Sequence, residues 1–159
     1  MKKSTKGFSL IELLIVVAII LIIAAIAIPN LLRSRIAANQ ASAVQSLRTV
    51  NTSEVSYATT FGTGYSTTLA ALGPITGTTA TAAAAGLIDS VLAGGTKSGY
   101  QVVYAPAAAD SNGQTNSYAM YANPLSVNTG TNYYYTDQTM VIRVNNTASA
   151  GASDSPIGN

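Results

Sequence analysis

The sequence has no cysteine, no histidine and no tryptophan, and charged residues make up only 9% of its 159 positions. Without histidine, the chain lacks the commonest general base and the commonest nitrogen ligand for metal ions. Without cysteine it cannot form disulfides, although this absence alone does not identify the compartment. The low charge also excludes a highly charged disordered chain and an ion-paired coiled coil. We therefore expect no catalytic residues and no cofactor.

Positive charge is concentrated at the start of the chain. The formal net charge is +2, from eight basic and six acidic residues. Lys2, Lys3 and Lys6 are three of the eight, so the sequence after Gly7 carries five basic against six acidic side chains. These five are spread too thinly to form a cationic stripe along a phosphate backbone. General nucleic-acid binding is therefore not expected.

A long apolar run follows the lysines. Residues 13–28 contain no polar side chain, and a helix over residues 8–28 would rise about 31 Å, enough to cross a hydrocarbon core of roughly 30 Å. Because the lysines should stay in the cytoplasm, everything after this run is predicted to lie beyond the inner membrane. The alternative is an ordinary secretory signal peptide, cleaved near the small residues Ala24, Ala25 and Ala27.

One acid, Glu12, lies inside the apolar segment. A lone carboxylate there costs about 2.5 kcal/mol or more on insertion scales, so it needs a compensating partner. Cleavage after Gly7 would expose the α-amino group of Phe8, about 6 Å of helical rise from Glu12. Pairing between this amino group and the acid of a neighbouring subunit is then sterically natural, which an ordinary signal peptide does not explain.

Residues 7–16 read Gly-Phe-Ser-Leu-Ile-Glu-Leu-Leu-Ile-Val. This segment strongly resembles the class III signal of type IV pilins and type II secretion pseudopilins. The resemblance implies that a membrane prepilin peptidase cuts between Gly7 and Phe8, removes the basic leader 1–7, and methylates the new amino group of Phe8. It also implies that Glu12 directs subunit registry during assembly.

Pro29 closes the apolar run, and many members of this family have proline at the same spacing from the cleavage site. Because proline in a helix removes one backbone hydrogen bond, one interpretation is a helix stop at the membrane surface. Beyond it, apolar residues recur with a helical period at Leu32, Ile36, Ala43, Leu47, Val50 and Tyr57. This pattern instead favours an amphipathic continuation and a single helix of about fifty residues. We assign Pro29, with Glu12, to assembly.

The rest of the chain predicts a small head built from strands and short helices. Turn residues favour a loop over 59–81 with one helical turn at 68–72, and Gly94-Gly95 would end a second short helix over 82–92. The strand candidates are 100–105, 118–122, 133–136 and 139–144, with a tight turn at Asp137-Gln138 before the last one. An antiparallel meander is the simplest arrangement.

The predicted fold class is therefore α+β: a long N-terminal helix, transmembrane in its first half, packed on a small antiparallel sheet. This architecture resembles the pilin fold, although many type IV pilins close a C-terminal loop with a disulfide that this chain cannot form. The expected organisation is a cleaved leader (1–7), a transmembrane and polymerisation helix (8–29), an amphipathic continuation (30–58), a globular head (59–144) and a flexible C-terminal tail (145–159).

Few head residues suggest chemistry. Asp89, Asp110 and Asp137 raise the hypothesis of a calcium site, because major pseudopilins often carry a calcium loop. No D-x-D spacing groups these acids, so we prefer solvated acids and no metal site. The tyrosine-rich strands are explained by core and rim packing. Ser98 beside Lys97 lacks any sign of the burial and oxyanion site that a catalytic pair needs.

The sequence thus predicts a structural subunit of a type IV pilus, which would support adhesion, surface motility or DNA uptake. A pseudopilin of a type II secretion system is the alternative within this class, and a signal-anchored periplasmic binding domain is the alternative from another class. The expected partners are further copies in a helical homopolymer, the prepilin peptidase, the inner membrane, and an inner-membrane assembly platform with its ATPase. The precursor would be a single-pass inner-membrane protein with a periplasmic head, and the product an extracellular pilus or a periplasmic pseudopilus.

Overall fold

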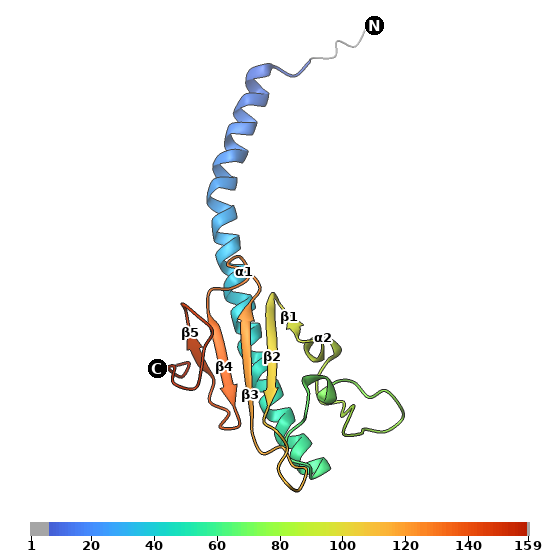
Figure 1. Cartoon of the computed structure of the whole chain (residues 1–159). Helices are drawn as coiled ribbons and strands as arrows, with labels where there is room; N and C mark the ends of the chain where they lie inside the picture. The colour runs from blue at the N-terminus through green and yellow to red at the C-terminus, as the bar shows by residue number, and fades with distance from the viewer. Residues whose placement is uncertain (1–6, 159) are drawn as a thin grey trace. The chain divides into compact units, whose positions relative to one another are not determined.

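The computed structural model describes residues 7–158. In chain order, its elements are α1 (Leu10–Phe61), the 3-10 helix η1 (Leu69–Leu72), α2 (Ser90–Ala93), β1 (Thr96–Lys97), β2 (Tyr100–Pro106), β3 (Tyr118–Pro124), β4 (Tyr133–Asp137) and β5 (Arg143–Asn145) (Figure 1). This is the predicted α+β class, with one long helix and one antiparallel sheet. The chain forms two compact units, one up to Arg35 and one from Ile36 onward.

Helix α1 has 52 residues and continues through Pro29. The expectation of one helix of about fifty residues is confirmed, and the interpretation of Pro29 as a helix stop is wrong. Within the first unit, the side chains of α1 are exposed almost throughout. The helix is long and apolar enough to cross a membrane.

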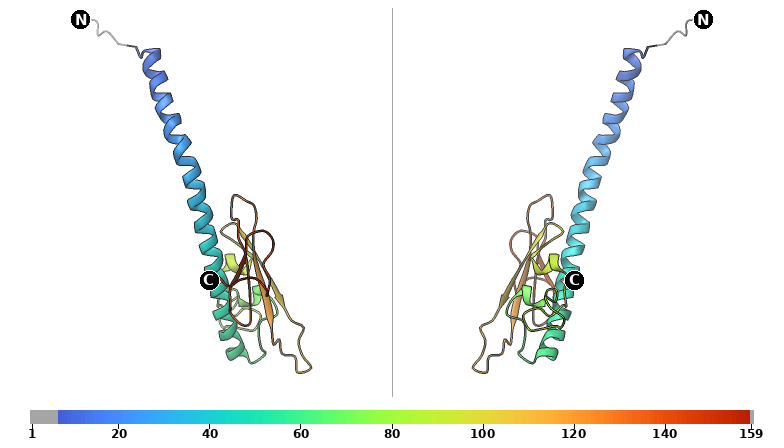
Figure 2. Two further views of the ribbon diagram at one scale, coloured as in Figure 1. Left: turned by 90° about the vertical axis from the view of Figure 1, so that its left-hand side faces the viewer. Right: turned by 90° about the vertical axis from the view of Figure 1, so that its right-hand side faces the viewer.

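In the second unit, the part of α1 from Ile36 onward packs against one face of the sheet (Figure 2). Ala43, Leu47, Val50 and Tyr57 are all at most 4% exposed. These four residues belong to the apolar pattern that predicted the amphipathic continuation, so the helical period correctly identified the face that is buried.

The five strands lie in the order β1-β2-β3-β4-β5, and every neighbouring pair is antiparallel. The predicted meander is therefore confirmed, with the two-residue strand β1 added at one edge. Tyr100, Val102, Met120, Ala122 and Tyr134 point from the central strands into the core, where they join the buried residues of α1. Alternation along β4 turns Tyr133 and Tyr135 to the other face, as expected.

Polar residues of α1 are buried beneath the sheet and hydrogen-bonded to it. The Asn51 side-chain amide donates to Thr136 Oγ1 at 2.9 Å, and the Tyr118 hydroxyl donates to Asn51 Oδ1 at 2.9 Å. One turn further, Glu54 is fully buried and accepts hydrogen bonds from the Ser66 amide at 2.8 Å and the Ser66 hydroxyl at 2.6 Å. These bonds satisfy the buried groups and fix the position of α1 on the head.

The helix predicted over residues 82–92 is wrong for most of its length. Only Ser90–Ala93 is helical, because the Asp89 carboxylate caps the amides of Val91 and Leu92 and starts α2 there. Before it, Gly86 has φ +71°, which is incompatible with a right-handed helix. The chain there runs alongside η1 instead, and its amides bond to carbonyls of residues 71–73. The helical turn predicted at 68–72 is confirmed as η1.

The connection between the last two strands is longer than predicted. Strand β4 extends to Asp137, and β5 begins only at Arg143, so the tight turn at Asp137-Gln138 and the strand over 139–144 are corrected. The Asp137 carboxylate accepts from the Thr139 amide at 2.9 Å, and the Met140 amide donates to the Asp137 carbonyl at 2.8 Å. These contacts curl the chain into a local turn, and Met140 adopts φ +61°.

The C-terminal segment, expected to be a flexible tail, is bound to the sheet. The Val144 amide donates to the Ser155 carbonyl at 3.0 Å, and the Ile157 amide donates to the Ile142 carbonyl at 2.9 Å. Ala150 is only 2% exposed, and Ile157 packs against the core. The small polar composition that suggested flexibility instead supplies hydrogen-bonding groups that hold this segment in place.

Candidate processing and assembly segment

The predicted cleavage site lies just outside the first helical turn. Residues 7–9 are not helical, and α1 begins at Leu10. The Phe8 side chain is 83% exposed. A Cβ added at Gly7 would meet no atom within 4 Å, so the fold itself places no steric demand on this glycine. The predicted leader residues Lys2, Lys3 and Lys6 lie outside the described residues.

The start of α1 is set by Ser9 and Glu12. The Ser9 backbone amide donates a hydrogen bond to Glu12 Oε2 at 2.9 Å, and the Leu13 amide donates to the Ser9 carbonyl at 3.3 Å. A Ser followed three residues later by Glu is the sequence of a capping box, in which the acid satisfies an amide at the helix start. The negative charge of Glu12 also interacts favourably with the positive end of the helix dipole.

The apolar surface of α1 in the first unit has no partner within that unit. Its large aliphatic side chains are 42–79% exposed, for example Leu21 at 63% and Ile26 at 66%. Leaving such surface in water costs about 25 cal/mol per Å², and soluble monomers rarely expose a continuous patch of this kind. A lipid bilayer or further apolar chains must therefore cover it.

The predicted processing and assembly residues occupy two places along the chain. Gly7 and Phe8 directly precede α1 and Glu12 lies in its first turn, whereas Pro29 is 17 residues after Glu12, about 25 Å further along the axis. The structure does not bring Pro29 near the other three. Within the helix, the missing amide of Pro29 leaves one carbonyl of the preceding turn without its helical bond.

The three acids considered for calcium are separated and bonded locally. Asp89 pairs with Lys97 at 2.7 Å, and the hydrogen bond from this lysine lowers the pKa of Asp89. Asp110 accepts from the amides of Gln114 and Asn112 at 3.0 and 2.8 Å, which lowers its pKa. Among residues 7–158, no three His, Cys, Asp or Glu side chains come close enough together to hold a metal ion.

Lys97 and Ser98, the pair considered for catalysis, bond to different partners. Lys97 Nζ is held by Asp89, while the Ser98 hydroxyl contacts the Ser42 hydroxyl at 2.8 Å. A lysine base must reach the serine that it activates. The sequence neighbours Lys97 and Ser98 therefore do not form a nucleophile and base pair.

Sequence reasoning missed two polar features of the head. One is the buried Glu54 with its Ser66 partner, whose sequence separation of 12 residues gives no local signal. The other is a hollow of about 470 Å³ lined by Asn132, by residues 144–147 and by residues 154–155. The run Asn145-Asn146-Thr147 was the only available hint, and it was assigned to the tail.

Comparison with known proteins agrees with the N-terminal geometry. The family described as "Prokaryotic N-terminal methylation motif" matches residues 2–28. The type IV wide pilus major component PilA4 of Thermus thermophilus is 65% identical over 37 residues, which cover 23% of this chain and 28% of that protein. No solved structure matches the chain.

These matches and the fold point to one class of protein. The chain combines a prepilin-type methylation motif, a transmembrane-like N-terminal helix and a pilin-like α+β architecture. The similarity to a type IV pilin supports the resemblance found in the sequence. The match spans little more than a quarter of the relative's length.

Proposed function

We propose that this chain is a structural subunit of a type IV pilus, processed by a prepilin peptidase and assembled through its N-terminal helix. The observation that carries the proposal is the first unit of α1. It joins a methylation motif at residues 2–28 to a helix whose aliphatic side chains are exposed on all sides. A bilayer before assembly and a bundle of identical helices afterwards would each cover this surface.

The proposed sequence of events begins at the inner membrane. The lysines of the leader hold residues 1–7 in the cytoplasm, while α1 anchors the precursor in the inner membrane with its head in the periplasm. The peptidase cuts between Gly7 and Phe8 and methylates Phe8. An assembly platform with its ATPase then moves the subunit into a helical homopolymer, where Glu12 pairs with the Phe8 amino group of a neighbour.

Replacing Gly7 by valine tests the processing step. Because a side chain at this position meets no atom of the folded chain, Gly7→Val should leave the head intact and block cleavage. Gly77→Val is the matched control, since Gly77 also has open space around its Cβ position. Mass spectrometry of the purified protein should show the leader retained in Gly7→Val and removed in both the control and the wild type.

The second part of the experiment examines the filaments. Sheared surface material should contain filaments of the wild type and the Gly77→Val control, and none of the Gly7→Val variant. Normal cleavage and normal filaments from Gly7→Val would overturn the proposed processing route. A wild-type chain that formed no filaments would instead favour an anchored periplasmic domain. Filaments found only in the periplasm would instead identify a pseudopilin.

A further inference from the structure

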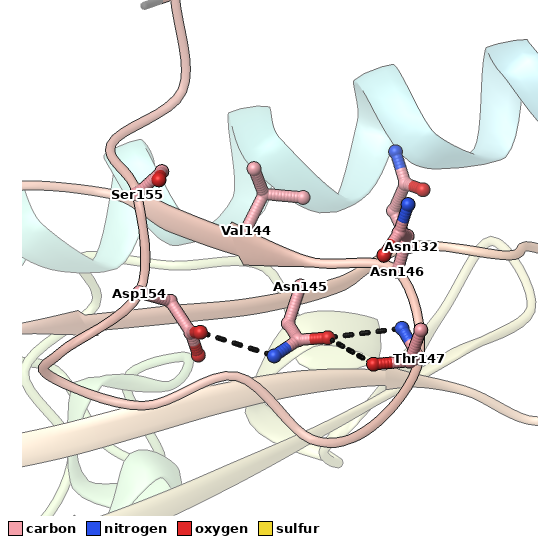
Figure 3. A pocket seen from close by; sticks show the side chains of 7 residues that line it. All are labelled: Asn132, Val144, Asn145, Asn146, Thr147, Asp154 and Ser155. Atoms are coloured by element: carbon pink, nitrogen blue, oxygen red, sulfur yellow. Dashed lines mark hydrogen bonds between the residues drawn. The ribbon is translucent and has the colours of Figure 1, made fainter.

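A polar hollow lies at the edge of the sheet, where β5 meets the C-terminal segment. Its volume is about 470 Å³, within the range of sites for small molecules. Six polar residues and Val144 line it, and Figure 3 shows their side chains: Asn132, Asn145, Asn146, Thr147, Asp154 and Ser155. None of them carries a positive charge.

Two of these side chains are held in place by the protein. Asn145 donates from its amide nitrogen to Asp154 Oδ1 at 3.0 Å, and its Oδ1 accepts from the Thr147 amide and hydroxyl, both at 2.9 Å (Figure 3). Asp154 Oδ2 accepts from the Gly151 amide at 2.8 Å. A ligand would therefore meet an amide and a carboxylate whose orientation is already fixed, which lowers the entropy lost on binding.

Hydrogen-bonding capacity remains free in the hollow. The side chains of Asn146, Thr147 and Ser155 are exposed, so their polar groups are open to a ligand. Asn145 uses one of its two amide hydrogens, and each Asp154 oxygen accepts one bond although it can accept more. The wall therefore offers both hydrogen-bond donors and hydrogen-bond acceptors.

A second hollow of about 360 Å³ adjoins the first and shares Asn146 and Thr147 with it. Its lining is less polar and includes Tyr133, Leu125 and Val127. An aromatic ring offers a flat apolar face together with a hydroxyl that can hydrogen-bond. The two hollows lie on either side of these shared residues, and we call them together the Asn146 groove.

The composition of the Asn146 groove excludes several classes of ligand. Phosphate and carboxylate groups are recognised by Arg and Lys, and the one nearby cation, Arg143, is turned to the Asp154 carbonyl at 2.8 Å. Calcium needs six to eight oxygen ligands, usually with several carboxylates, and the groove has one. A wholly apolar ligand would leave its amides and hydroxyls without partners.

From this chemistry we propose that the Asn146 groove binds a short neutral oligosaccharide. Each hydroxyl of a sugar both donates and accepts, which matches the mixture of amide, carboxylate and hydroxyl groups in the first hollow. The C–H face of a sugar ring is apolar and fits Tyr133 in the second hollow. Asn146 is the central residue because both hollows share it. This binding goes beyond the role of the chain as a filament subunit.

The test measures binding to the full-length chain in a detergent without a sugar headgroup. The probes are lactose, cellotriose and chitotriose as neutral oligosaccharides, with 3′-sialyllactose as an anionic comparison. Saturation-transfer NMR should show contact with at least one neutral probe, and titration should give its dissociation constant. Asn146→Ala should weaken that binding at least about tenfold, equivalent to about 1.4 kcal/mol.

Asn112→Ala is the matched control, since Asn112 is an exposed asparagine in the connection between β2 and β3, outside the groove. It should bind as the wild type does. The proposal is overturned if no neutral probe binds, if Asn146→Ala binds as tightly as Asn112→Ala, or if only the sialylated probe binds. Binding is measured on unassembled protein, so failure to form filaments would leave this result unaffected.

Discussion

The backbone amide of Ser9, the residue after Phe8, donates a hydrogen bond to the Glu12 carboxylate at 2.9 Å. The acid that resemblance assigns to assembly therefore already stabilises the start of its own helix. In the proposed filament the same carboxylate has two competing partners, the Ser9 amide of its own chain and the Phe8 amine of a neighbour. The two contacts differ because a neutral acceptor can still bond to the amide, whereas ion pairing with the amine requires the negative charge.

Glutamine at position 12 separates these two contacts. Glu12→Gln should keep the bond to the Ser9 amide, since Gln also serves in a capping box, whereas Glu12→Ala should lose it, at a local cost of about 1 kcal/mol. Both variants should be cleaved normally, because Gly7 and not Glu12 marks the cut. Both should form far fewer filaments than the wild type.

Three measurements check this prediction: the mass of the mature protein, hydrogen exchange of the Ser9 amide, and filament yield in sheared material. Exchange should be faster in Glu12→Ala than in Glu12→Gln. If Glu12→Gln assembled as well as the wild type, the helix cap and not the charge would be what assembly requires.

Removing the Ser66 hydroxyl should destabilise the head. Ser66→Ala deletes the 2.6 Å bond to the buried Glu54 carboxylate, and bonds to charged groups contribute roughly 1.5–3 kcal/mol. Burial raises the pKa of the nearby Tyr104 phenol well above its usual range, so this group remains a donor and stays with the Ser66 carbonyl at 3.0 Å. Urea unfolding should show the loss, and Ser56→Ala, which removes only an intrahelical bond, should show little.

Gly64 should not tolerate a side chain. Its φ is +76°, and an added Cβ would lie 2.2 Å from the Thr115 carbonyl oxygen, in the parallel bridge that joins these two residues. Gly64→Ala should cost roughly 1–3 kcal/mol or more, from strain and from displacement of this bridge. Gly113→Ala is the control, because Gly113 has φ +77° but open space around its Cβ position, so this variant measures the backbone strain alone. Equal losses of stability in the two variants would refute a role for close packing at Gly64.

Stability should fall in acid partly through Asp137. Burial alone would raise the pKa of Asp137, but hydrogen bonds from Thr139 and Tyr135 outweigh it and lower the pKa below its ordinary value of 3.8. A lowered folded pKa contributes stability above the unfolded value, and this contribution is lost as the pH falls through the folded value. Asp137→Asn should therefore be less stable than the wild type at about pH 6, and the difference should shrink below about pH 3. A difference that stayed constant with pH would exclude titration of this group.

Asp154 should hold the C-terminal segment on the sheet. Asp154→Ala removes acceptors for the Asn145 amide and the Gly151 backbone, with an expected loss of roughly 1–2 kcal/mol because the group is partly exposed. Amides of residues 151–157 should then exchange faster with solvent, while those of the central strands stay protected. Ser153→Ala, an exposed neighbour, is the control, and unchanged exchange in Asp154→Ala would show that other contacts hold the segment.

The sequence predicted the long helix and the processing signal because both are local patterns. Residues 7–16 carry the signal in one continuous stretch, and the spacing of Leu47, Val50 and Tyr57 defines a helical face without reference to the rest of the fold. The meander was predictable for the same reason, since aromatic and β-branched runs separated by turn residues join neighbours in sequence.

What the sequence could not predict depends on contacts between distant residues. Gly86 is compatible with a helix in the sequence pattern, but its φ is +71°. The amides of residues 85–88 bond to carbonyls of residues 71–73 and not to one another, so this segment is not helical. Asn51 and Thr136 are 85 residues apart, so no local pattern reveals their bond. The Asn146 groove was missed because a segment of small and polar residues was predicted to be flexible.

Both edges of the sheet are poor templates for another strand. β1 has two residues and β5 has three, and the open side of β5 is occupied by the C-terminal segment, through the Val144 amide and the bridge between Arg143 and Pro156. Long unpaired edges invite neighbouring chains to add on and fuse into aggregates. Subunits crowded together at very high local concentration can therefore slide past or separate from one another without being trapped in a continuous intermolecular sheet.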